Sequence, residues 1–114
     1  MSDQDELAAA VARVKALPAF AIPRWWLTFY LVGAPVDLAS VASRLREVGA
    51  QNTDNPDCGF LYPKLLVVSE LRAISDAISS VRRVANTEGV KLEGLDADTS
   101  PEVGASEFKR LLDF

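Results

Sequence analysis

The spacing of hydrophobic positions changes several times along the chain, and each spacing predicts a helix or a strand. Aromatic and β-branched residues dominate residues 25–32, which indicates a strand covered at least partly on both faces. Its two faces carry, respectively, Leu27, Phe29 and Leu31, and Trp26, Thr28, Tyr30 and Val32. A further strand is expected over residues 90–95, where apolar and polar positions alternate.

Apolar residues at helical spacing predict three longer helices, over residues 3–17, 37–48 and 71–87. Asp37 is the expected N-cap of the second helix, and Ser69 or Ser75 that of the third. Residues 18–24, which contain two prolines, are expected to form an extended linker. A last short helix is predicted to begin at Ser106 and to present an apolar edge formed by Phe108, Leu111 and Leu112.

A polar edge strand is expected over residues 50–54, paired with the hydrophobic run from Phe60 to Val68. Pro63 interrupts that run, and because proline cannot donate to a ladder, the regular part of the strand is expected at Lys64–Val68. The turn between the two has the composition Asn55-Pro56-Asp57-Cys58-Gly59. Asp54 and Asp57 do not have the spacing of a calcium loop, so a solvated turn is the favoured interpretation.

From residue 25 the order of elements is strand, helix, strand, strand, helix, strand. This βαββαβ order predicts an α+β, ferredoxin-like fold with a four-stranded antiparallel sheet and two helices on one face. The N-terminal helix and the short C-terminal helix are additions to it. The chain then divides into an N-terminal helix and linker (1–24), a ferredoxin-like domain (25–98) and a C-terminal tail (99–114).

The sheet face opposite the two helices is where a function is expected. Trp26 and Tyr30 form an aromatic patch there, and with Arg24 beside it the patch has the composition of a binding hot spot. Three candidates for covering it are the N-terminal helix, the C-terminal segment and another protein chain. A second copy of this chain, giving a homodimer through the open sheet face, is one form of the last.

Composition and charge narrow the classes of function. The 114 residues include 12 basic and 16 acidic ones, for a net charge of −4. This balance disfavours direct binding of nucleic acid and suits an acidic protein that meets a basic partner. No apolar run approaches the length of a membrane span and no signal peptide is visible, so a cytoplasmic location without membrane contact is expected.

The chain contains no histidine and a single cysteine, Cys58. Ser–His and Cys–His nucleophilic sites are therefore excluded within it, and the commonest metal ligand is absent. Asp96 and Asp98 form an acidic pair beside Glu93 that could do acid–base work, but on a terminal loop we expect them to be solvated. The sequence predicts no enzyme activity, no cofactor and no metal site.

A resemblance to a known family lies in the order of elements and in a diffuse pattern. Its segments are Leu27–Val32, Leu45–Ala50, Lys64–Val68, Ile78–Asn86 and, most strongly, Glu88–Leu95. Over residues 26–96 the chain resembles the ribonuclease E inhibitors known as regulator of ribonuclease activity B (RraB). Members typically end the last strand in an aromatic–acidic–glycine–tryptophan motif; Glu93 and Gly94 match it, whereas leucine replaces both aromatics. The acidic tail of some members has no counterpart in this sequence. The resemblance implies the ferredoxin-like fold and ribonuclease E as partner.

Three hypotheses of function follow. The first is a non-enzymatic, protein-binding regulator of the RraB type, with Arg24, Trp26, Tyr30, Glu93, Asp96 and Asp98 as its binding residues. The second is an immunity protein that neutralises one cognate toxin, such as a basic nuclease. The third is a small-molecule sensor, for which Tyr62, Lys64 and Glu93 are the polar strand candidates.

Overall fold

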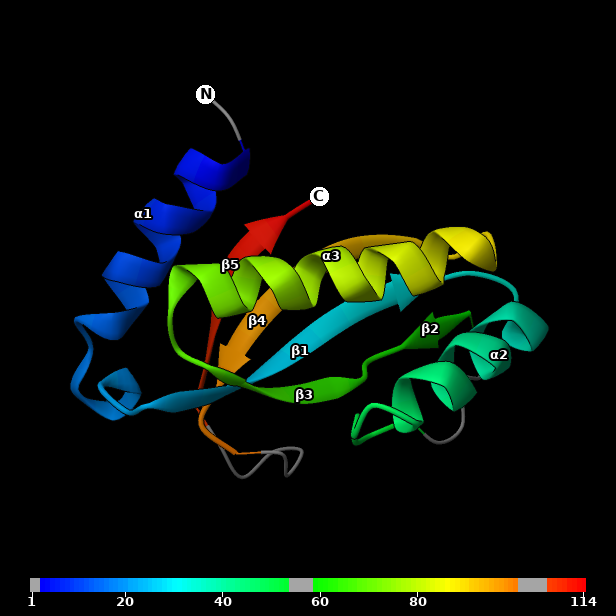
Figure 1. Ribbon diagram of the computed structural model, residues 1–114, viewed down its shortest axis with the longest axis horizontal. Helices are drawn as coiled ribbons and strands as arrows, with labels where there is room; N and C mark the ends of the chain where they lie inside the picture. Colours follow the sequence, from blue (N-terminus) through cyan, green and yellow to red (C-terminus); the bar gives the residue numbers. More distant parts are fainter. Residues whose placement is uncertain (1–2, 54–58, 101–106) are drawn as a thin grey trace.

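The computed structural model describes residues 3–53, 59–100 and 107–114 (Figure 1). This part of the chain is α+β. Its elements are α1 (Asp3–Lys15), the 3-10 helix η1 (Pro18–Phe20), β1 (Arg24–Val32), α2 (Pro35–Arg46), β2 (Phe60–Leu61), β3 (Lys64–Val68), α3 (Leu71–Thr87), β4 (Lys91–Asp98) and β5 (Phe108–Asp113). No helix among them is long and apolar enough to cross a membrane. Asp54, Asp57, Cys58 and Ser106 lie outside the described residues.

All strand pairs are antiparallel, and β1 lies at the centre of the sheet. Along one side of β1 run β2 and β3, and along the other runs β4, followed by β5. β2 and β3 continue one another, because Phe60 and Val68 belong to the same register against β1. The break falls at Pro63, whose carbonyl still accepts the Phe29 N–H (3.0 Å). The regular strand at Lys64–Val68 is confirmed.

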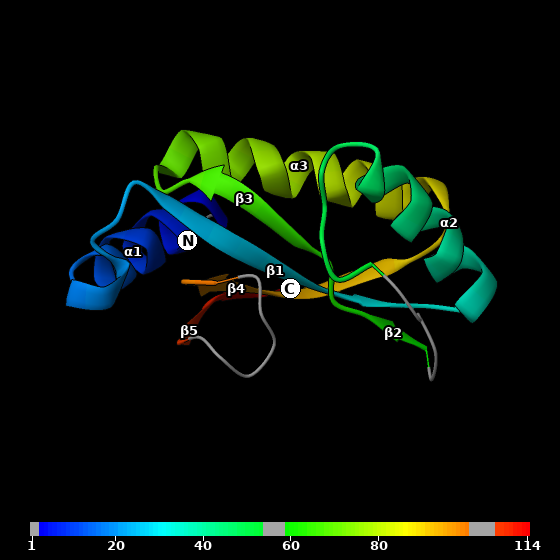
Figure 2. The ribbon, with the colours of Figure 1, turned by 90° about the horizontal axis from the view of Figure 1, so that it is seen from below.

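Helices α2 and α3 lie on the same face of the sheet (Figure 2). From β1 this face receives the fully buried side chains of Trp25, Leu27, Phe29 and Leu31. Helix α1 contacts α3 and β5, and its Leu7, Val11 and Val14 join the same hydrophobic core. The N-terminal helix therefore packs beside α3 and β5 rather than over the opposite face, which carries Trp26 and Tyr30.

The C-terminal segment departs from the prediction. It forms strand β5 against β4, so the sheet has five strands, and the predicted short C-terminal helix was wrong. Apolar residues at 108, 111 and 112 fit a helix, but the edge of β4 offers backbone groups that an extended segment satisfies. A register shift between Leu95 and Asp96 leaves Leu111 as an extra residue, and this lets Leu111 and Leu112 both be buried.

Helix α2 is shifted from its predicted range of 37–48, and α2 and α3 both have other N-cap residues than expected. α2 begins at Pro35, because proline suits the first position of a helix, and Asp37 lies in its first turn rather than at its cap. α3 covers the predicted range, but Glu70 is its N-cap residue. The hydroxyl of Ser69 donates instead to the Ile22 carbonyl (2.6 Å), which joins β3 to the segment before β1.

Two connections differ as well. An edge strand was expected over residues 50–54; within the described part of that range, 50–53, the structure has one antiparallel bridge, between Gln51 and Lys64. The linker over residues 18–24 contains η1, whose Phe20 is fully buried. β4 runs on to Asp98, three residues beyond the predicted end of the strand. The overall arrangement of helices and antiparallel sheet is compatible with a ferredoxin-like fold.

Candidate functional site

We call the sheet surface opposite α2 and α3 the open face. Alternation along the strands and their register place on it Trp26, Thr28, Tyr30 and Val32 of β1, Phe60, Tyr62, Lys64, Leu66 and Val68 from the β2–β3 run, Gly94, Asp96 and Asp98 of β4, and Phe108 and Arg110 of β5. The predicted division of β1 into two faces is confirmed. Charged groups stand on the open face where the helix face has aliphatic ones.

The middle of the open face holds a buried ion pair. Lys64 Nζ lies 2.8 Å from Asp98 Oδ2, and the two residues are only 5% and 4% exposed. Asp98 also accepts the Ser100 N–H through Oδ1 (3.2 Å). Between this pair and Asp96 lies Thr28, whose buried hydroxyl oxygen has no hydrogen-bond partner among the described residues. A buried charge is tolerated only when it is paired. Lys64 of β3 and Asp98 of β4, on the two sides of β1, can therefore be buried only together.

A second polar group lies beside the first and joins three strands. The Tyr30 hydroxyl donates to Asp96 Oδ2, and Arg110 Nε lies 2.7 Å from Asp96 Oδ1. The Arg110 guanidinium also sits 4.5 Å above the Tyr30 ring and 2.8 Å from Asp113. Burial raises the pKa of Tyr30 to about 12, and its hydrogen bond to the Asp96 carboxylate and the charge of that carboxylate act in the same direction.

Gly94 has no side chain, and this leaves room for the Arg110 guanidinium. It faces Tyr30 across β1–β4 and Asp113 across β4–β5. A Cβ at residue 94 would collide with a terminal nitrogen of Arg110 and would lie 3.1 Å from a ring carbon of Tyr30. The glycine that the family resemblance pointed to is thus the residue that lets a guanidinium lie close to the backbone over a tyrosine.

Exposed aromatic rings border this group. Tyr62 meets the Tyr30 ring edge-on at 5.2 Å, and Phe60 stacks on Tyr62 at 6.3 Å. Phe60 is 46% exposed and Tyr62 is 41% exposed. We call Tyr30, Phe60, Tyr62 and Arg110 the aromatic–arginine cluster. With Val32, Glu93 and Asp113 it lines a shallow concavity of about 230 Å³.

The six residues predicted for binding divide between this cluster and the rest of the sheet. Tyr30 and Asp96 are in direct contact. Glu93 lies at the register shift in β4 and lines the concavity next to Tyr30. Trp26 is partly buried and lies opposite Asp98. Arg24 is exposed at the start of β1, about 20 Å along the strand from Tyr30 at the usual rise per residue.

The expectation that Asp96 and Asp98 are solvated on a terminal loop was wrong. Both lie within β4, and they are 2% and 4% exposed. The reason is that β5 and β3 place Arg110 and Lys64 beside them, so the charges are neutralised where they are buried. Two partners hold Asp96 in place, the Tyr30 hydroxyl and the Arg110 guanidinium.

Arg110 and Asp113 are site residues that sequence reasoning missed. The apolar spacing of their segment predicts a helix, whereas in the structure the segment is strand β5, paired with β4. The available signal was the unusual Gly94 within a strand, since a glycine there marks the close approach of another group.

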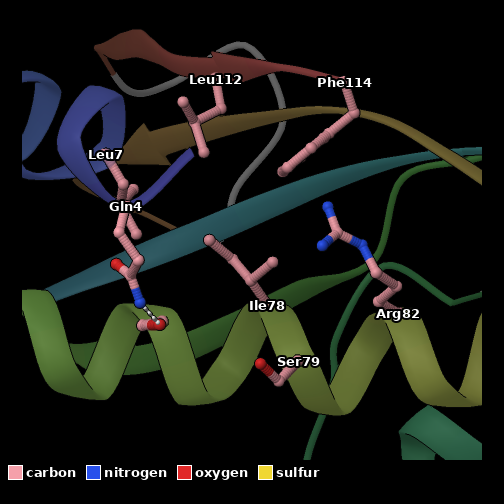
Figure 3. Close-up of a pocket in the computed structure, with 8 residues that line it drawn as sticks. Gln4, Leu7, Ile78, Ser79, Arg82, Leu112 and Phe114 are labelled. Atoms are coloured by element: carbon pink, nitrogen blue, oxygen red, sulfur yellow. Dashed lines mark hydrogen bonds between the residues drawn. The ribbon is translucent and has the colours of Figure 1, made fainter. Parts of the chain in front are cut away.

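A separate hollow of about 140 Å³ lies on the helix side, between α1, α3 and the end of β5 (Figure 3). Leu7, Ile78 and Leu112 form its apolar wall, and Arg82 points to the Phe114 ring at 4.7 Å. A hydrogen bond from Gln4 to Ser75 (2.8 Å) crosses from α1 to α3 beside it. These contacts hold α1 and the C-terminal strand onto α3.

The described part of the chain has no group of three or more Cys, Asp or Glu side chains placed to hold a metal ion. The open face presents aromatic rings beside paired charges. In comparisons with known proteins, no family model, no curated protein and no solved structure matches this chain.

Proposed function

We propose that the chain is a non-enzymatic regulator that binds another protein through the open face, with the aromatic–arginine cluster at the centre of the contact. The observation that carries this proposal is the exposure of Phe60 and Tyr62 around a guanidinium that Asp96 and Asp113 hold in place. Aromatic and arginine side chains dominate binding hot spots, and fixed rotamers lose little entropy on association. The site acts by shape and charge in the cytoplasm.

The partner is proposed to be a basic protein. The chain carries a net charge of −4, and the concavity is bordered by Glu93 and Asp113, both exposed. Opposite fields accelerate encounter and fix orientation, so a basic surface such as that of a nuclease is complementary. The order of elements and Gly94 support the RraB-like, ferredoxin-like assignment, which makes ribonuclease E the first nuclease to test.

The experiment compares the wild type with a Phe60→Ala/Tyr62→Ala variant. The immobilised chain is used to recover its partner, and the dissociation constant is then measured for both forms. We expect the variant to bind about tenfold or more weakly, and the wild type to lose affinity as salt rises. Val36→Ala is the matched control, because Val36 is 75% exposed at the start of α2.

Equal affinity of the variant and the wild type would contradict the proposal. Recovery of no partner at low and at physiological salt would do so too. The identity of the partner separates the two protein-binding hypotheses: slower RNA cleavage by ribonuclease E in the presence of the chain supports the RraB-like role. Neutralisation of a single toxin supports the immunity role.

A second candidate is a small-molecule sensor, because the side chains of Tyr30, Glu93 and Arg110 converge on the concavity. The volume of the concavity, about 230 Å³, is below the usual range for ligand pockets. A metabolite that binds there raises the melting temperature of the wild type and not that of the Phe60→Ala/Tyr62→Ala variant. A metabolite library without such a compound would leave protein binding as the better account.

A further inference from the structure

The hollow between α1, α3 and β5 combines an apolar wall with a positive charge (Figure 3). The described residues that line it include one cation, Arg82, no acidic side chain, and neutral polar groups from Gln4, Ser75 and Ser79. The remaining lining side chains are apolar. Such a hollow is complementary to a molecule that carries a negative charge on an apolar body.

The apolar wall comes from three elements. Leu7 of α1, Ile78 of α3 and Leu112 of β5 all belong to the hydrophobic core. Figure 3 shows Ile78, Leu112 and the Phe114 ring directed toward the space between α3 and β5. The hollow has a volume of about 140 Å³. Because an apolar cavity of about 150 Å³ holds one benzene-sized molecule, the apolar body that fits here is about the size of one aromatic ring.

Arg82 supplies the positive charge, and no acidic side chain neutralises it. Its guanidinium carbon lies 4.7 Å from the centre of the Phe114 ring, so the ring covers one face of the guanidinium plane. Among the described residues, no carboxylate lies within ion-pair distance of Arg82, whereas Arg110 on the open face is paired with Asp96 and Asp113. The N–H groups of a guanidinium lie within its plane. The edge of Arg82 can therefore bind a carboxylate through two parallel hydrogen bonds.

The walls of the hollow are held by hydrogen bonds within the chain. Gln4 Nε2 donates to Ser75 Oγ (2.8 Å), which ties the start of α1 to α3. The Phe114 N–H donates to the Glu93 carbonyl (2.9 Å), which fixes the backbone that carries the ring. A site whose walls are already in place loses little entropy when a ligand binds.

We infer that this hollow binds a small monocarboxylate whose apolar body is about the size of one aromatic ring. The carboxylate pairs with Arg82, and the body packs against Leu7, Ile78 and Leu112. The inference does not rest on the proposed protein contact, because the hollow shares none of its described lining residues with the concavity beside Tyr30. A ligand here contacts α1, α3 and β5 at once, so it also stabilises the packing of α1.

The affinity is expected to be low, because the ligand has few atoms and the hollow is open to solvent where Ser79 and Phe114 are exposed. One charge-assisted pair and one partly buried ring correspond to a dissociation constant on the order of 0.1–1 mM. The charge and the apolar body are both needed for this value, since each alone makes only half of the contacts.

The test is a titration of the isotopically labelled full chain with benzoate, followed through its amide signals in nuclear magnetic resonance spectra. Benzamide is the matched ligand without the charge, and acetate carries the charge without the ring. At constant ionic strength and up to about 20 mM ligand, we expect benzoate to bind about tenfold or more tightly than either. The largest shifts are expected at Ser79, Arg82 and Phe114.

Two neighbouring arginines provide a matched pair of variants. Arg82→Gln removes the charge from the hollow and should weaken benzoate binding about tenfold or more. Arg83→Gln removes the same charge from the next residue of α3, which is exposed and does not line the hollow, and should leave the affinity unchanged. Arg82→Lys keeps the charge without the planar guanidinium and should bind with intermediate affinity.

Several outcomes would overturn the inference. They are equal affinity for benzoate and benzamide, unchanged affinity in Arg82→Gln, no binding at about 20 mM benzoate, or shifts that gather at Phe60 and Tyr62 instead of around Arg82. The Phe60→Ala/Tyr62→Ala variant separates this site from the proposed protein contact, because its benzoate affinity should equal that of the wild type. A chain that binds benzoate at Arg82 but recovers no partner contradicts only the protein contact.

Discussion

The two faces of β1 exclude water by different means. Under the helices, Leu27 and Phe29 are fully buried among aliphatic neighbours. On the open face, Lys64 and Asp98 reach nearly the same burial as an ion pair, and Asp96 does so between a tyrosine and an arginine. The helix face is stabilised by the hydrophobic effect, which has no preferred direction. The open face is stabilised by ion pairs and hydrogen bonds, which require a fixed geometry.

The difference has a consequence for recognition. Apolar side chains under a helix leave nothing for a partner to contact, whereas the paired charges order the rings of Tyr30 and Tyr62 at the surface. A polar network of this kind adds little net stability but fixes which side chains stand where. The helix face is expected to carry most of the free energy of unfolding, and the open face most of the specificity.

The adjacent tryptophans give the sharpest contrast between the faces. Trp25 is fully buried and its indole N–H donates to the Phe20 carbonyl (2.9 Å), whereas Trp26 is only partly buried. Trp25→Ala should lower the free energy of unfolding by about 5 kcal/mol, near the upper end for this substitution. Trp26→Ala should lower it by about 1–2 kcal/mol. Urea denaturation followed by circular dichroism measures both, and equal losses would mean that the two faces are not distinct.

Breaking the buried ion pair tests whether the open face depends on its charges. Lys64→Met leaves Asp98 buried without its cation, and we expect a loss of about 3 kcal/mol. Replacing both partners, as in Lys64→Met/Asp98→Leu, should recover most of that loss, because two apolar groups need no pairing. Thermal unfolding of the three proteins gives the comparison. A double variant no more stable than Lys64→Met would show that the pair contributes more than mutual neutralisation.

The sequence predicted the helix face well because its signal is periodic. Alternation in residues 25–32 assigned the two faces of β1, and helical spacing predicted α3 over about residues 71–87, the range that the structure has. Such patterns depend on neighbours a few positions apart, which the chain order displays directly.

The open face was predicted only in part, because its contacts join distant positions. Tyr30 and Asp96 were identified, but the burial of Asp98 depends on Lys64, 34 residues away, and that of Asp96 depends on Arg110. Arg110 itself reaches the site only because its segment pairs with β4 as a strand. Its apolar spacing fits a helix equally well, so tertiary pairing decided between two local alternatives.

Alkaline pH is expected to destabilise the folded protein through Tyr30, which lies on the open face. Tyr30 titrates at about 10 when unfolded and at about 12 in the folded protein, where its neutral form is favoured. Between these values the unfolded chain has lost the proton that the folded chain keeps, so stability falls as pH rises from 10 to 12. Below pH 10 this group adds no pH dependence. Denaturation midpoints across this range should fall less in Tyr30→Phe than in the wild type, and parallel curves would contradict the assignment.

The smallest change in the free energy of unfolding is expected at Thr28, a residue of the open face. Its hydroxyl oxygen is buried without a partner among the described residues, between two strands whose charges are paired. Thr28→Val keeps the shape and removes the unpaired polar group, so the free energy of unfolding should stay within about 0.5 kcal/mol or rise. Thr28→Ala is the control, because it removes the methyl group as well and should be less stable. A loss of several kcal/mol in Thr28→Val, measured by urea denaturation, would show that the hydroxyl does bond in the folded protein, and that the open face is a more complete polar network than its ion pairs alone.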